Sequence, residues 1–132
     1  MSQPASYELM TNFIDQMGVP ALITQESEHR KAEETKIFLV NKRLEHLSGY
    51  GRNELIGLAP ELLVPDADRP MHLKHRQSFL DNPKYRSMGY GGHLKFQKKN
   101  GSIFPVSIEL SPHQTDEGFF VGLIIWPFPE SE

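Results

Sequence analysis

The sequence contains no cysteine, and this absence excludes several kinds of chemistry together. Without a thiol the chain can form no disulfide bond, no thiolate metal site and no cysteine nucleophile. Long apolar runs are also missing: no segment approaches the roughly 20 residues of a membrane-spanning helix, and the amino terminus lacks a basic segment followed by an apolar one. The sequence therefore predicts no membrane insertion and fits a reducing, cytoplasmic compartment.

An excess of positive charge is missing too. The chain has 14 Lys and Arg against 17 Asp and Glu, a formal net charge of −3. A general nucleic-acid binder needs a concentrated excess of basic residues to neutralise phosphates, and here the basic residues are scattered, so we expect no nucleic-acid partner. No nucleophile with a base, paired carboxylates or phosphate-binding loop stands out, so we expect no enzyme activity. The 132 residues, 38% of them hydrophobic, predict one compact domain.

The strongest structural signal is a predicted β-hairpin around Asn100-Gly101. Apolar residues occupy alternate positions on both sides of this turn, namely Leu94 and Phe96 before it and Phe104, Val106, Ile108 and Leu110 after it. Because side chains on a strand alternate between its two faces, the four that follow the turn share one face. Other elements must cover that face, either directly or with a ligand in between.

The remaining patterns predict an α+β fold with an antiparallel sheet. Strands are expected at 19–24 and 37–40, joined by a charged, solvated connection, and a nearly continuous apolar run at 118–126 is typical of a central strand. Short helices fill the middle of the chain, and the longest of them, 70–80, begins near Pro70. At about 100° per residue, His72 on this helix faces inward and His75 lies near the edge.

The amino-terminal segment 7–17 predicts a short amphipathic helix, with Gly18 just past its end. Its apolar residues either pack on their own domain or pair with a second copy of the chain. We take segment 1–18 as a capping and dimerisation helix and expect a homodimer. The candidate dimer contacts are Leu9, Met10, Phe13, Ile14 and Met17.

Several local strings, in this order, resemble the PAS (Per-Arnt-Sim) sensor domain family over about 19–126. They are F-L-V-N leading to L-E-H-L-S-G-Y, then E-L-I-G, L-V-P with R-x-x-H, R-x-M-G, and K-N-G-S-x-F-P-V-x-I-x-L-S. The resemblance implies a five-stranded antiparallel sheet with short helices forming a cup over one face, with the amino-terminal helix outside it. We place the PAS domain at 19–127 and a tail or linker at 128–132.

In that family the cup binds a small molecule or is filled by side chains, and the domain passes a signal to a histidine kinase, a cyclase or a transcription regulator. The resemblance therefore implies a sensor in signal transduction whose regulated module is not in this chain. The rival hypothesis is a ligand-free module that only pairs. The residues expected to line the cup are Val106, Ile108, Leu110, Leu94, Phe96, Phe79 and His72.

The cofactor stays open at this point. His72 matches the position from which haem oxygen sensors of the family supply their iron ligand, but Gly92 stands where those sensors place an arginine. The missing cysteine excludes a cysteine-adduct flavin photosensor, whereas a non-covalent flavin remains possible. Five aromatic residues could stack on such a flavin, although aromatic residues in strands more often form plain core: Phe96, Phe104, Phe119, Phe120 and Trp126. His72 and His75 lack a third ligand for a separate metal site.

The carboxyl end departs from the family, because Pro127 and Pro129 follow the last predicted strand directly. Two prolines cannot join an α-helical hydrogen-bond ladder, so a helical output linker there is not expected. When a ligand fills the cup, we expect strands 93–98 and 103–111 to shift and this shift to be passed to the amino-terminal helix. The chain ends soon after its last strand, from which we expect a domain of a longer protein.

Overall fold

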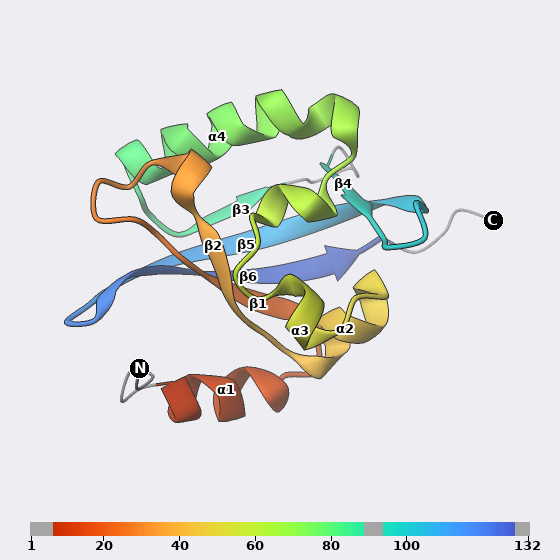
Figure 1. Ribbon diagram of the computed structural model, residues 1–132, viewed down its shortest axis with the longest axis horizontal. Helices are drawn as coiled ribbons and strands as arrows, with labels where there is room; N and C mark the ends of the chain where they lie inside the picture. Colours follow the sequence, from red (N-terminus) through yellow and green to blue (C-terminus); the bar gives the residue numbers. More distant parts are fainter. Residues whose placement is uncertain (1–6, 89–93, 129–132) are drawn as a thin grey trace.

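The computed structural model describes residues 7–88 and 94–128 (Figure 1). Its α-helices are α1 (Tyr7–Asp15), α2 (Lys42–Ser48), α3 (Arg52–Leu55) and α4 (Arg69–Asp81). Its short 3-10 helices are η1 (Ala32–Glu34), η2 (Pro60–Leu63) and η3 (Asp66–Asp68). Its strands are β1 (Ala21–Gln25), β2 (Lys36–Val40), β3 (Arg86–Met88), β4 (Leu94–Gln97), β5 (Ile103–Thr115) and β6 (Gly118–Pro127). The predicted α+β class is confirmed.

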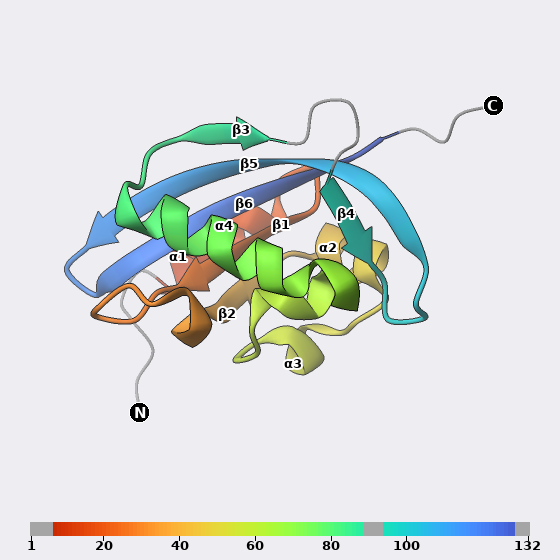
Figure 2. The same ribbon diagram turned by 90° about the horizontal axis from the view of Figure 1, so that it is seen from above.

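The six strands form one antiparallel sheet in the order β2-β1-β6-β5-β3, with β4 also pairing with β5. The apolar run of β6 is central, as predicted, and β5 and β6 form the long, curved middle of the sheet (Figure 2). Five strands were expected and six are present, because β3 and β4 lie in sequence along β5. Met88 at the end of β3 is opposite Ile108, and Leu94 at the start of β4 is opposite Val106. Ile108 and Val106 are two positions apart on β5, whereas five residues lie between Met88 and Leu94 in the chain.

The predicted hairpin turn is present. Gly101 has a φ of 91°, a left-handed conformation that glycine adopts without a steric penalty. Its backbone N–H donates to the Lys98 carbonyl at 2.9 Å, and the Asn100 side chain accepts from Ser102 N–H at 2.9 Å. The second strand of the hairpin is longer than expected, since β5 continues to Thr115.

The helices divide between the two faces of the sheet. Figure 1 shows α4 on one side and α1 on the other, which confirms the predicted placement of the amino-terminal helix. On the outer face the Tyr7 ring meets Phe38 at 5.4 Å between centroids, and Phe38 meets Phe120 at 5.0 Å. The inner face packs against α2, α3 and η2 through Leu44, Leu55 and Leu63.

Asn41 connects three elements from a fully buried position. Its Oδ1 caps α2 by accepting from Leu44 N–H at 2.9 Å, and it also accepts from Ala21 N–H at 3.0 Å. Its Nδ2 donates to the carbonyls of Ile14 and Val19, both at 2.8 Å. One amide side chain therefore holds the end of α1, the start of β1 and the start of α2.

The connection between β1 and β2 differs from its prediction as a solvated, featureless segment. Ala32, Thr35 and Glu26 are buried, with exposed fractions of 2%, 2% and 8%. Ala32 packs against Phe79 and Leu80 of α4. The charged residues around them, such as Glu33, stay exposed. The pattern was misinterpreted because three isolated inward positions among many charges leave no periodic signal.

Among the described residues, no helix has the length and apolar character needed to cross a membrane.

Candidate ligand-binding cavity

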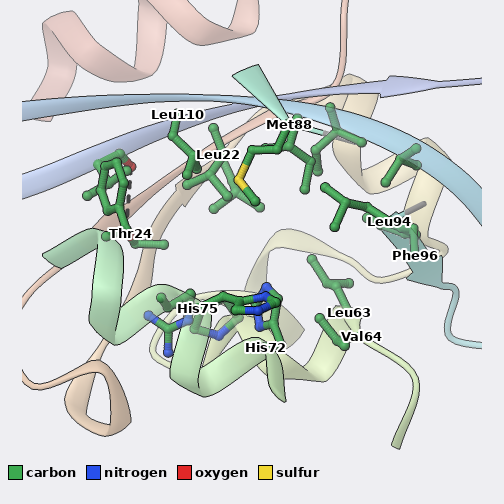
Figure 3. Close-up of a pocket in the computed structure, with 18 of the residues that line it drawn as sticks. Leu22, Thr24, Leu63, Val64, His72, His75, Met88, Leu94, Phe96 and Leu110 are labelled. Carbon is green, nitrogen blue, oxygen red and sulfur yellow. Dashed lines mark hydrogen bonds between the residues drawn. The ribbon is translucent and has the colours of Figure 1, made fainter. Parts of the chain in front are cut away.

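A cavity of about 330 Å³ lies between α4 and the inner face of the sheet. Its lining comes from two clusters of buried side chains, one around Leu22, Phe96 and Val106 and one around Phe79 and Val121. Figure 3 shows His72 and His75 on α4 facing Leu22, Met88 and Leu110 across the space. Its volume is at the small end of the range of ligand sites.

The structure brings all seven predicted cup residues together on the wall of this cavity: Val106, Ile108, Leu110, Leu94, Phe96, Phe79 and His72. That they contact a ligand stays a prediction. The resemblance to the PAS family suggested these residues, and the alternation of β5 agrees with the placement of Val106, Ile108 and Leu110. Sequence reasoning missed two kinds of lining residue. Those on β1 and β6 could have been found from the alternation of these strands, whereas the polar ones follow no periodic pattern. The missed residues include Leu22, Thr24, Glu26, Arg76, Val121, Leu123 and Ile125.

A buried ion pair holds α4 to η2 beside the cavity. Arg76 Nε and Nη2 donate to the two oxygens of Glu61 at 2.6 and 2.9 Å, a bidentate pair. His72 Nδ1 lies 2.8 Å from Glu61 Oε2. The side chains of Glu61 and Arg76 are 15% and 16% exposed. This pair connects α4 to η2 and so restrains the position of α4 over the cavity.

Burial alone would raise the pKa of Glu61. The hydrogen bonds from His72 and Arg76 and the positive charge of Arg76 outweigh it, and lower this pKa from an ordinary 4.5 to about 2. Glu61 is therefore a carboxylate at neutral pH and accepts from both partners. His72 Nδ1 is then the donor, which leaves Nε2 on the other side of the ring.

The same guanidinium continues the network to the sheet. Arg76 Nη1 donates to Thr35 Oγ1 at 2.8 Å, and Arg76 Nη2 also donates to the Ala32 carbonyl at 2.6 Å. Thr35 Oγ1 donates to Glu26 Oε1 at 2.5 Å, while Thr24 Oγ1 donates to Glu26 Oε2 at 2.7 Å. A chain of polar contacts thus runs from α4 to the end of β1 along one wall of the cavity.

Comparison with known families decides what kind of domain this is. A sequence model described as PAS domain matches residues 31–126, which is most of the chain. The chain belongs to the PAS domain family. The predicted resemblance is thereby confirmed, and the cavity between α4 and the sheet is the cup of this PAS domain.

Solved structures share the fold of this PAS domain at low sequence identity. A LOV protein from Rhodobacter sphaeroides superposes with a TM-score of 0.77 at 15% identity, covering 99% of this chain and 70% of the other. The PAS domain of the fruit-fly ELK potassium channel gives 0.72 at 13% identity, covering 96% and 100%. The PAS domain of an HTR-like protein from Haloarcula marismortui gives 0.69 at 14%, covering 93% and 92%.

One curated relative of this PAS domain is the oxygen sensor protein DosP from Escherichia coli strain K12. The two are 33% identical over 70 residues, which is 53% of this chain but 9% of DosP. The match therefore concerns one part of a much longer protein.

The helix side of the PAS cup fits an iron ligand. Within residues 7–88 and 94–128, His72 Nε2 has no hydrogen-bond partner, and Nδ1 is held by Glu61, the arrangement usual for histidines that bind metals. Gly92 lies outside the described residues. Within those residues no three His, Asp or Glu side chains gather as a metal site of their own.

A stacked flavin has less support in this cup. Of the five aromatic residues proposed above to stack on a flavin, Phe96 is the one on the cavity wall. Phe120 packs on the outer face against Phe38, and Trp126 is 42% exposed. Residues next to each other on a strand, such as Phe119 and Phe120, point to opposite faces of the sheet, so these rings do not share one surface.

Proposed function

We propose that this PAS domain is a regulatory, non-catalytic sensor that binds a small ligand in its cup. The observation that supports this most is the cavity of about 330 Å³, which is lined by members of both buried clusters. Protein interiors are close-packed, so a space of this size lined by packed clusters favours an occupant. The regulated module is a histidine kinase, a cyclase or a transcription regulator in the cytoplasm, in the same protein or a partner.

A short path supports signal transfer from the cup to α1. Val121 lines the cavity, and its neighbour Phe120 points to the other face of β6, where it packs on Phe38. Phe38 in turn meets Tyr7 of α1. A ligand that displaces β6 therefore changes how α1 packs on the sheet, through the Phe120–Phe38 and Phe38–Tyr7 ring contacts. The ligand needs only to bind one of the two positions of α1 more tightly than the other.

Replacing Ile108 with tryptophan tests the cup as a binding site. Apolar cavities of this kind take up benzene, so NMR titration with benzene should show saturable binding to the wild type. The indole fills the space, and I108W should bind benzene at least about tenfold more weakly. Ile103→Trp is the control, because Ile103 starts the same strand but is 53% exposed. Equal uptake by wild type and I108W would reject the cup as a binding site.

The same purified protein shows which cofactor, if any, it carries. A Soret band in its absorption spectrum identifies bound haem, for which His72 is the candidate ligand, and flavin has its own visible bands.

We also propose that the domain pairs through α1. Leu9 and Phe13, one turn apart, are 71% and 67% exposed, whereas Ile14 is 5% exposed and packs on its own domain. Met10 and Met17 are half-buried. Of the five candidate dimer contacts, Leu9 and Phe13 are therefore the ones free to meet a second copy, and Ile14 is closed to it.

The double variant Leu9→Ser with Phe13→Ser is expected to convert dimer to monomer, because it removes the exposed apolar strip and leaves Ile14 in place. Sedimentation velocity should show the dimer dissociation constant rising at least about tenfold. Asn12→Ser, an exposed polar position on the same helix, is the matched control. A dimer of unchanged affinity in the double variant would remove α1 from the interface.

A further inference from the structure

The cavity has one buried acid on its wall. Glu26 follows β1, is 8% exposed and borders the space between α4 and the sheet. Thr24, whose hydroxyl donates to it, lies on the same wall (Figure 3). Most of the other lining side chains are apolar, and the other charged ones are Arg76, Arg86, Lys95 and Asp68.

The hydrogen-bond geometry around Glu26 fits a group that accepts on both oxygens. Thr35 Oγ1 accepts from Arg76, so its own proton goes to Glu26 Oε1. The Thr24 hydroxyl lies 2.7 Å from Glu26 Oε2, against 3.5 Å from the Val121 carbonyl, so it donates to Glu26. Both oxygens therefore act as acceptors. Each keeps a second lone pair that no protein donor within the described residues fills.

The charges around Glu26 do not balance. Arg76 contacts Glu61 in bidentate fashion and reaches Glu26 through the Thr35 hydroxyl alone. Arg30, on the other side, donates to Gln114 and stacks over the Phe119 ring at 4.1 Å. Glu61 thus has both Arg76 and His72 as partners, whereas within the described residues no basic side chain contacts the Glu26 carboxyl directly. A buried charge without its own cation is costly, and a ligand cation would offset this cost.

Two basic residues that also line the cavity would favour an anionic ligand instead. Lys95 is exposed, and the half-buried Arg86 guanidinium is 6.0 Å from the Phe79 ring. Asp68, also exposed, balances part of this charge. Solvent screens exposed charges, so they select ligands less strongly than the buried Glu26 does.

We propose that the cup selects a small amphipathic amine, whose ammonium group binds Glu26 and whose apolar body lies between α4 and the inner face of the sheet. This rests on the proposed function and specifies its ligand class. Ammonium N–H groups fill the unused lone pairs of Glu26, and a charge-assisted bond in a desolvated site is about twice as strong as a neutral one. The aliphatic walls exclude a ligand that is polar throughout.

Three probes with one phenyl body test the inference: phenethylamine, phenethyl alcohol and hydrocinnamate, each titrated by NMR. Phenethylamine should bind at least about tenfold more tightly than the alcohol or the carboxylate. The variant Glu26→Gln, which keeps the shape and removes the charge, should lose this preference. Glu33→Gln removes the same charge from an exposed neighbouring helix and should leave all three affinities unchanged.

The outcomes separate the two proposals. Binding in which the alcohol or hydrocinnamate equals or exceeds the amine overturns the inference and leaves the cup a ligand site. An amine preference that survives in a folded E26Q also overturns it, because another group is then responsible. If none of the three probes and no benzene enters the wild type, both proposals fail. Should E26Q not fold, the order of the three probes on the wild type decides.

Discussion

The variant Arg76→Met is expected to lose about 3–5 kcal/mol in the free energy of unfolding, because removing one partner of a buried ion pair leaves the other charge uncompensated. Glu61 would keep His72 as its remaining donor. Its side chain is 15% exposed, so water can replace little of what Arg76 provides. The Ala32 carbonyl and Thr35 hydroxyl also lose their contacts with Arg76. Urea denaturation, monitored by circular dichroism, measures the loss.

Arg43→Met is the matched control, since Arg43 is exposed on α2. Its effect should stay within about 0.5 kcal/mol, as for other surface substitutions. If the two variants lose equal stability, the Arg76–Glu61 pair does not hold α4 in place.

Acid should reproduce the effect in the wild type. The pKa of Glu61 is lowered in the folded state, so its contribution is present above its ordinary pKa of 4.5 and is lost as the pH falls toward about 2. A lowering of this size corresponds to roughly 3 kcal/mol. Arg76→Met raises the folded pKa of Glu61 and should flatten the pH dependence of stability over this range. Parallel pH profiles for the two proteins would contradict the assignment.

The variant Asn41→Ala is expected to lose about 3–4 kcal/mol, because a fully buried side chain with four hydrogen bonds disappears. The Val19 carbonyl and the Ala21 N–H lose their contacts with the Asn41 side chain, and the Ile14 carbonyl keeps only the Met17 N–H. Because two of these groups belong to α1 and its exit, we expect α1 amides to exchange hydrogen faster even where the sheet stays folded.

Two further substitutions divide the role of Asn41. Asn41→Ser keeps an oxygen that can cap α2 and removes the two contacts of Nδ2, so its loss should fall between those of N41A and the control. Asn53→Ala, at an exposed position of α3, is that control. A serine variant as unstable as N41A would mean that the cap contributes little and the tether to α1 dominates.

Much of the candidate site could be predicted, since its floor follows from alternation. Val106, Ile108 and Leu110 occupy every second position of β5, and His72 follows from the turn of α4. Glu26 and Thr35 could not be found in this way. Their burial depends on Arg76, which is 41 residues from Thr35, and a contact over that separation leaves no period in either segment.

The sequence by itself determined the α+β class, the hairpin at Asn100-Gly101 and membership of the PAS family, because these depend on local propensity and on motifs in order, but it missed η1 and β3. The tertiary structure alone decided that Ile14 faces inward while Leu9 and Phe13 face solvent, and that Glu26 borders the cavity. The physical reason is that a side chain is buried only when a second surface packs against it. The sequence of a helix or a loop specifies one of these surfaces, and the tertiary fold decides which other surface covers it.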